Sequence, residues 1–123
     1  MVVRRSGEPD AYAETADLHE LFSPGNPEWG HPPLEEEARA AEPDWDADGW
    51  FDAPAVRWYP TVQWFDGRGY ADHLRSTSLY RKLGPGVREP LLDAIAERIR
   101  TGMGDRAARR YLTFLRAGRR RER

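Results

Sequence analysis

The sequence contains no cysteine, which excludes a disulfide framework and a thiolate metal site from its 123 residues. It also lacks an apolar run long enough for a membrane span. Met1–Val3 is followed at once by Arg4 and Arg5 instead of the apolar core of a signal peptide. These absences predict a cytoplasmic protein that makes no membrane contact.

Hydrophobic residues are scarce at 39%, but five Trp, five Tyr and four Phe provide large side chains that a core can bury. This composition predicts one small folded domain and argues against full disorder. We expect a short N-terminal extension over residues 1–9, a single domain over 10–117 and a basic tail over 118–123.

Charge is divided unevenly along the chain, although the net charge is only −2. Residues 1–55 hold fourteen acids against three arginines, whereas residues 56–123 hold sixteen basic residues against seven acids. Such asymmetry can indicate an acidic tail and a basic binding surface. It can equally indicate two halves that attract each other within one fold, which we favour.

The central stretch begins as a strand over about 55–65 and changes at Asp66 into a helix. Its alternation predicts a half-buried strand with one apolar face, formed by Val56, Trp58, Pro60, Val62 and Trp64. Pro60 cannot donate a ladder hydrogen bond, which predicts an edge strand or a bulge. Asp66 can cap the helix, whose buried side would hold Tyr70, Ala71, Leu74 and Ser78.

Further helices are predicted before and after this stretch. Asp10 can cap a helix that ends at Phe22, with an apolar side formed by Tyr12, Ala16, Leu18, Leu21 and Phe22. A short acidic helix is expected over 34–41. The clearest helix covers about 87–101 and would bury Leu91, Leu92, Ile95 and Ile99, with Pro90 in its first turn.

The segment over about 108–116 suits either a strand or a helix, and we interpret it as a strand that pairs with 55–65. Val2 and Val3 could form a strand remnant or a frayed end. The fold class is therefore α+β, with a small antiparallel strand pair packed against three to four helices.

An acidic loop matches the opening of a calcium-binding loop through Asp44, Asp46, Asp48 and Gly49, with Asp52 at the ninth position. Its twelfth position is Ala55 instead of the bidentate glutamate, so we favour a solvated loop anchored by tryptophans. The histidines show no metal-ligand spacing, and we expect no metal site. His73 could act as a base or a hydrogen-bonding group, or be a partly exposed helical residue.

Two further patterns are weak. Gly67-Arg68-Gly69 follows a strand but lacks the third glycine of a phosphate-binding loop, so we interpret it as a turn. The C-terminal arginines could bind phosphates beside the stacking rings of Tyr111 and Phe114; they are Arg109, Arg110, Arg116 and Arg119–Arg121. With a negative net charge and a short tail, nucleic-acid binding is the less favoured interpretation.

The order of features resembles the C-terminal part of class I S-adenosylmethionine-dependent methyltransferases of a type widespread in bacteria. The matching residues are Tyr70, Leu74, Ser76 and Ser78, then Leu91, Leu92, Ile95 and Ile99, then Tyr111 to Leu115. The resemblance covers roughly residues 50–117. The doubly wound cofactor-binding half of that family has no counterpart here, so no catalytic or cofactor-binding residue is carried over.

The resemblance implies a truncated, methyltransferase-like transferase region that shapes the acceptor pocket and is inactive alone. By location it suggests Trp64, Arg68, Tyr70 and His73 as acceptor-pocket residues. S-adenosylmethionine would be the cofactor only if a separate cofactor-binding half completed the fold. The expected partner is that half or a second copy of the chain. The alternative is a stand-alone protein-interaction module, and a nucleic-acid binder is less favoured.

Overall fold

The computed structural model describes residues 1–41, 49–52 and 55–121, and it has an α+β fold. The calcium-type pattern at Asp44, Asp46 and Asp48 lies outside these residues. The elements in chain order are β1 (Val2–Val3), α1 (Ala11–Phe22), α2 (Glu35–Ala40), β2 (Ala55–Phe65), α3 (Gly67–Arg75), α4 (Ser78–Arg81), α5 (Pro85–Gly102) and β3 (Ala107–Ala117). None of the helices described is both long and apolar enough to cross a membrane.

The sheet has three strands in the order β1-β3-β2, and both neighbouring pairs are antiparallel. The long pair runs without a break from Ala55 opposite Ala117 to Phe65 opposite Ala107. The predicted strand pair is therefore confirmed, and the ambiguous last segment is a strand. Val2 and Val3 are paired with Tyr111 and Arg110, so this end of the chain is part of the sheet.

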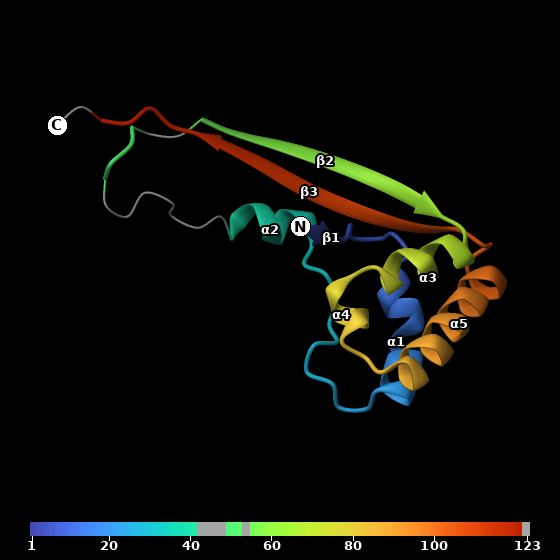
Figure 1. Cartoon of the computed structure of the whole chain (residues 1–123). Coiled ribbons are helices and arrows are strands. Elements are labelled where there is room, and N and C mark those ends of the chain that lie inside the picture. The colour runs from blue at the N-terminus through green and yellow to red at the C-terminus, as the bar shows by residue number, and fades with distance from the viewer. Residues whose placement is uncertain (42–48, 53–54, 122–123) are drawn as a thin grey trace.

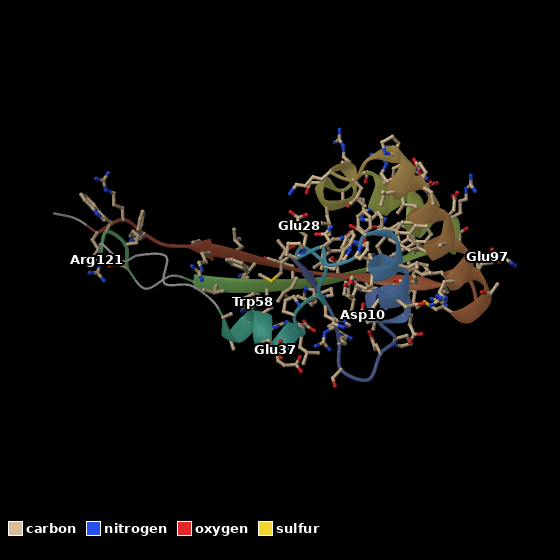
Figure 2. All side chains as sticks on the ribbon, turned by 90° about the horizontal axis from the view of Figure 1, so that it is seen from below. Asp10, Glu28, Glu37, Trp58, Glu97 and Arg121 are labelled. Carbon is tan, nitrogen blue, oxygen red and sulfur yellow. The ribbon has the colours of Figure 1, made fainter. Side chains whose placement is uncertain are left out.

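Helices cover the two faces of the sheet at different places. Paired residues of β2 and β3 share a face, and successive residues alternate between faces. Phe65 and Ala107 pack with α1, α3, α4 and α5 in the main core. Leu112 has the opposite parity and packs with Val3, Trp58 and Ala38 of α2 in a second, smaller core. Figure 1 shows the four-helix cluster at one end of the long β2–β3 pair, and Figure 2 places Arg121 at the other end, away from Glu97.

The N-terminus of α3 lies directly against α5. A Cβ added to Gly67 would stand 2.4 Å from the Ala96 carbonyl oxygen, closer than real Cβ atoms approach any atom. The Gly67 amide donates to Asp105 Oδ1 at 2.8 Å, and Asp66 Oδ1 caps the helix by accepting from the Gly69 amide. The predicted cap is confirmed, but the Gly67-Arg68-Gly69 segment begins a helix instead of forming a turn, because close packing requires glycine there.

The main core is built on α5, whose Leu91, Leu92, Ile95 and Ile99 are fully buried as the sequence predicted. The position predicted for Pro90 is wrong, because α5 begins at Pro85 and places Pro90 beyond the first turn. The missing Pro90 amide leaves the carbonyl of Gly86, an exposed residue, without its helical donor. Water can replace that donor at this exposed turn, which makes the interior proline tolerable.

The buried side of α1 differs from the prediction. Asp10 caps the helix as expected, by accepting the Tyr12 amide at 3.0 Å. The buried residues are Ala11, Thr15 and His19, whereas Leu21 is 71% exposed. The small and polar stripe therefore faces the core, and the predicted Leu18 and Phe22 pack beside it as partly buried residues. Likewise Ser78 is exposed, because α3 ends at Arg75 and Ser78 begins α4.

The predicted apolar face of β2 is buried only in part: Val56 and Trp58 are half-buried and Trp58 packs in the second core, but no side chain of the strand is fully buried. Val62 and Trp64 are 42% and 50% exposed, since the helices cover only parts of the sheet. Pro60 marks an edge strand without a bulge, because the register is continuous. Its partner Leu112 exchanges backbone hydrogen bonds with Met1 on the β1 side. Pro60 therefore directs its nitrogen to the open side of β2, where no ladder hydrogen bond is lost.

Ion pairs join the acidic and basic halves of the chain. Arg110 binds both carboxylate oxygens of Glu8, and the other pairs across the halves are Arg98–Asp17, Lys82–Glu28 and Arg121–Asp52. These contacts support attraction between two halves of one fold. The segment predicted as a solvated tail is also attached, because Arg120 forms a bridge with Phe51.

Candidate functional site

A cleft of about 230 Å³ lies where β1 and β3 meet α1, α3, α4 and the loop over residues 29–32. We call it the aromatic cleft. Its aromatic and charged lining residues are Asp10, Tyr12, Trp29, His31, Tyr70, Tyr80, Arg109 and Arg110. Five aromatic rings, the His31 imidazole included, and a mixture of charges therefore line one small space that is open to solvent.

Behind the cleft wall, His19 is 1% exposed and holds Tyr80 in place. Its Nδ1 lies 2.8 Å from the Thr15 carbonyl oxygen, which can only accept, so Nδ1 carries the hydrogen. Burial lowers the pKa of His19 and keeps the ring neutral, so Nε2 accepts from the Tyr80 hydroxyl at 2.7 Å. The Trp29 ring stands edge-on to His19, with centroids 4.8 Å apart. This cluster fixes two of the cleft's rings.

The carboxylate at the cleft rim is already engaged. Asp10 Oδ1 accepts the Tyr12 amide as the α1 cap, and Oδ2 lies 3.1 Å from His31 Nδ1. The Tyr12 ring stands edge-on to His31, with centroids 5.1 Å apart. Asp10 thus orders the rim through a helix cap and a histidine contact.

Arg109 brings positive charge to the opposite wall, next to the buried Tyr70. Burial raises the pKa of the Tyr70 hydroxyl, and the guanidinium opposes that rise. Burial, with a contribution from Arg109, lowers the pKa of His73. The Arg109 charge therefore lowers the pKa of both Tyr70 and His73. The arginine also lies over the Tyr111 ring, 5.9 Å from its centroid.

The four residues proposed from the resemblance do not share one cavity. Tyr70 lines the aromatic cleft, whereas the His73 Nε2 atom lies 3.1 Å from the Tyr111 hydroxyl on the sheet side of α3. Phe65 links these two, with ring centroids 6.0 Å from Tyr70 and 5.1 Å from His73. Trp64 has the opposite parity to Phe65, is half exposed, and stacks under Arg106 at 4.1 Å.

Arg68 lies farther from that group. It is exposed and lines a shallow acidic depression with Asp66, Asp93, Glu97 and Asp105. The Phe65 ring therefore contacts both Tyr70 and His73, whereas Trp64 and Arg68 lie outside this group. How any of the four acts on an acceptor stays a prediction.

Sequence reasoning missed most of the aromatic cleft. His19 and Tyr80 are 61 residues apart, so only the fold brings them together. His19 could have been found from its spacing, because it stands four residues after Thr15 and eight after Ala11 on a helix that must bury one side. No comparable pattern identifies Trp29 or Arg109.

The C-terminal arginines do not form one basic face. Arg109 and Arg110 alternate between the two faces of β3, and Arg110 is held by Glu8. Arg116 lies over Phe114, and Arg120 over Trp50. A phosphate backbone would need several free cations along one surface. Whether the C-terminal arginines contact a nucleic acid stays a prediction.

The aromatic cleft is smaller than the pockets that commonly bind molecules as large as S-adenosylmethionine. Pockets for ligands of that size have volumes of about 300–1,000 Å³, larger than the 230 Å³ found here. We therefore derive no step through the cofactor. Among the residues that the structure describes, no three His, Asp or Glu side chains are placed to hold a metal ion.

Comparisons of this chain with protein-family models, with curated proteins and with solved structures gave no match.

Proposed function

We propose that this chain is the acceptor-side region of a methyltransferase-like protein, and that the aromatic cleft holds the molecule to be methylated. The cofactor would then be bound by a separate part of the assembly. The observation that carries the proposal is that residues of the methyltransferase-like pattern wall a ligand-sized cleft. Tyr70 and Leu74 line it, and the fully buried Leu91 and Leu92 belong to the core behind them.

A small cleft with aromatic walls suits an acceptor better than a cofactor. Aromatic walls exclude water and hold a flat ligand in one orientation, and such positioning is a large part of catalysis by proximity. The hydroxyl of Tyr80 is fixed by His19, so the wall is preorganised. The role given to this chain is therefore to bind and orient, while methyl transfer requires the cofactor-bearing part.

The test has two arms. Thermal melting of the purified chain with and without S-adenosylmethionine should show no shift, because a ligand raises the midpoint only if it binds the native state. The tagged chain should then be recovered from cells that make it and irradiated with radiolabelled S-adenosylmethionine. We expect the label on an associated protein and none on the chain. A cofactor-dependent shift of the isolated chain, or the absence of any labelled partner, would overturn the proposal.

A second candidate function is self-association through the sheet, and exposed apolar side chains favour it. Tyr59 and Leu115 are 48% and 54% exposed and lie diagonally adjacent on one face. Arg57 is the only charged residue of β2 and lies on this face opposite Leu115, so two stacked copies must keep their Arg57 side chains apart. Pairing along the β2 edge is less suitable, since Pro60 leaves a gap in the row of donors.

Sedimentation analysis of the chain separates this candidate from the first. The wild type should form a dimer in the range of about 10–100 μM, typical of modest interfaces. Introducing lysine at both Tyr59 and Leu115 should give a monomer. The control Val62→Lys lies on the opposite face and should leave the dimer intact. A wild type that is monomeric throughout this range would eliminate the candidate.

A further inference from the structure

Arg109 is a partly buried cation that has no carboxylate partner among the residues described. Its Nε atom is buried and has no hydrogen-bond partner, and no carboxylate in the described part of the chain forms an ion pair with it. Its neighbour Arg110 is the contrast, since Glu8 binds it through both oxygens at 2.6 and 2.7 Å. The same short stretch of β3 thus holds one arginine neutralised by a carboxylate and one that contacts only the neutral Tyr70 hydroxyl and the Tyr111 ring, with its Nε unsatisfied.

A guanidinium without a carboxylate partner in a partly desolvated site is costly, because a neutral hydroxyl and a ring face replace only part of the water that solvated the charge. The planar fork of arginine matches a carboxylate, which can accept from two of its nitrogens at once. Asp10, on the other wall of the cleft, does not fill this role, since its oxygens are used by the Tyr12 amide and His31.

The remainder of the cleft defines the body of the ligand. Tyr12, Trp29 and Tyr80 offer ring surfaces, and the Trp29 and Tyr80 centroids are 5.5 Å apart with their planes inclined at 38°. A volume of about 230 Å³ admits a small molecule only. A ligand with a flat aromatic ring gains the most binding energy from such walls, through edge-on or offset stacking.

We propose that the aromatic cleft binds a small aromatic carboxylate, with the carboxylate on the Arg109 guanidinium and the ring among Tyr12, Trp29 and Tyr80. As a statement about the acceptor, this inference rests on the proposed function, because it names the class of molecule that the cleft would present for methylation. As a statement about binding, it stands on the geometry of the cleft.

Benzoate is the probe, and benzamide is its neutral counterpart of nearly equal shape. Titration of the full chain followed by ¹H–¹⁵N NMR should move the Trp29 indole resonance and those of β3 near Arg109. Benzamide should bind about tenfold more weakly or worse, because it loses the charge-assisted contact. Inorganic phosphate, which lacks a ring, should also bind about tenfold more weakly.

Variants assign the contact to one side chain. Arg109→Gln should weaken benzoate binding about tenfold or more, and Arg109→Lys should fall between it and the wild type, since lysine keeps the charge but not the fork. Arg106→Gln is the matched control: Arg106 is exposed and stacks on Trp64 outside the cleft, so binding should change less than about twofold. The NMR spectra themselves report whether each variant is folded.

The inference is overturned if benzoate leaves the cleft resonances unmoved up to about 10 mM, the weak limit of specific binding. Equal binding of benzoate and benzamide, or binding of phosphate as tight as that of benzoate, would overturn it too. Its failure differs from that of the proposed function. If benzoate binds but no partner is labelled by the cofactor, the methyltransferase role is excluded and the ligand class stands. If a partner is labelled but benzoate does not bind, the ligand class is excluded and the methyltransferase role stands.

Discussion

Replacement of Gly67 by alanine tests the packing on which the helical layer depends. The added Cβ would lie 2.4 Å from the Ala96 carbonyl oxygen and 3.2 Å from Asp105 Oδ1. The first neighbour is backbone in the middle of α5 and cannot rotate away. To restore an ordinary contact, α3 and α5 must separate by about 1 Å.

The expected loss follows from two opposing terms. Overpacking of this kind costs about 1–3 kcal/mol, and the better helix propensity of alanine returns at most about 1 kcal/mol. Because the Gly67 amide hydrogen bond to Asp105 must also shift, we expect a net destabilisation of about 2 kcal/mol. For a chain of this size that lowers Tm by about 5–10 °C.

Urea unfolding followed by far-UV circular dichroism measures the change. Gly86→Ala is the control, because Gly86 lies in the exposed first turns of α5 and an added Cβ meets nothing within 4 Å. That variant should gain a few tenths to about 1 kcal/mol. The two substitutions should therefore have opposite signs. A Gly67→Ala variant as stable as the wild type would refute the close approach of α3 and α5.

Three further predictions concern single groups. Burial lowers the pKa of His19 and His73 from 6.5, so below that pH the unfolded chain binds more protons than the native chain. The free energy of unfolding should therefore fall as pH drops below 6.5 towards the folded pKa values, by at most about 1.4 kcal/mol per pH unit for each histidine. Urea midpoints across this range should show that slope, and a flat profile would contradict it. Tyr80→Phe should cost about 1–3 kcal/mol, because it leaves the buried Nε2 of His19 without a donor; an unchanged urea midpoint would argue against that hydrogen bond. Pro60→Val restores an outward amide on β2 and should increase self-association by light scattering, whereas unchanged scattering would mean that Pro60 does not protect this edge.

Much of the fold could be predicted, because local rules and tertiary packing agree at those positions. The β2–β3 pair, the caps at Asp10 and Asp66 and the buried side of α5 all follow from alternation, capping chemistry and helical spacing. α5 is the clearest case, since its four large aliphatic residues have no competing arrangement.

The remainder depends on contacts that sequence patterns do not contain. The buried stripe of α1 is small and polar, and the partner that satisfies its His19 is Tyr80, 61 residues away. The apolar alternation of β2 predicted the partial burial of Val56 and Trp58 but not the exposure of Val62 and Trp64, since the helices cover only part of the sheet. The role of Gly67 depends on Ala96, 29 positions later, and therefore could not be inferred from the Gly-x-Gly pattern.

The separation of β2 from β3 along the chain has a consequence for the folding pathway. Their pairing closes loops of roughly 40–60 residues, whereas α3, α4 and α5 form from local contacts between the two strands. Helices should therefore form early, and docking of the strands should limit the refolding rate. Until β3 docks, both edges of β2 are unpaired and its tryptophans are exposed to water. Yield on refolding should then fall as protein concentration rises, because intermolecular pairing competes with the slow intramolecular step.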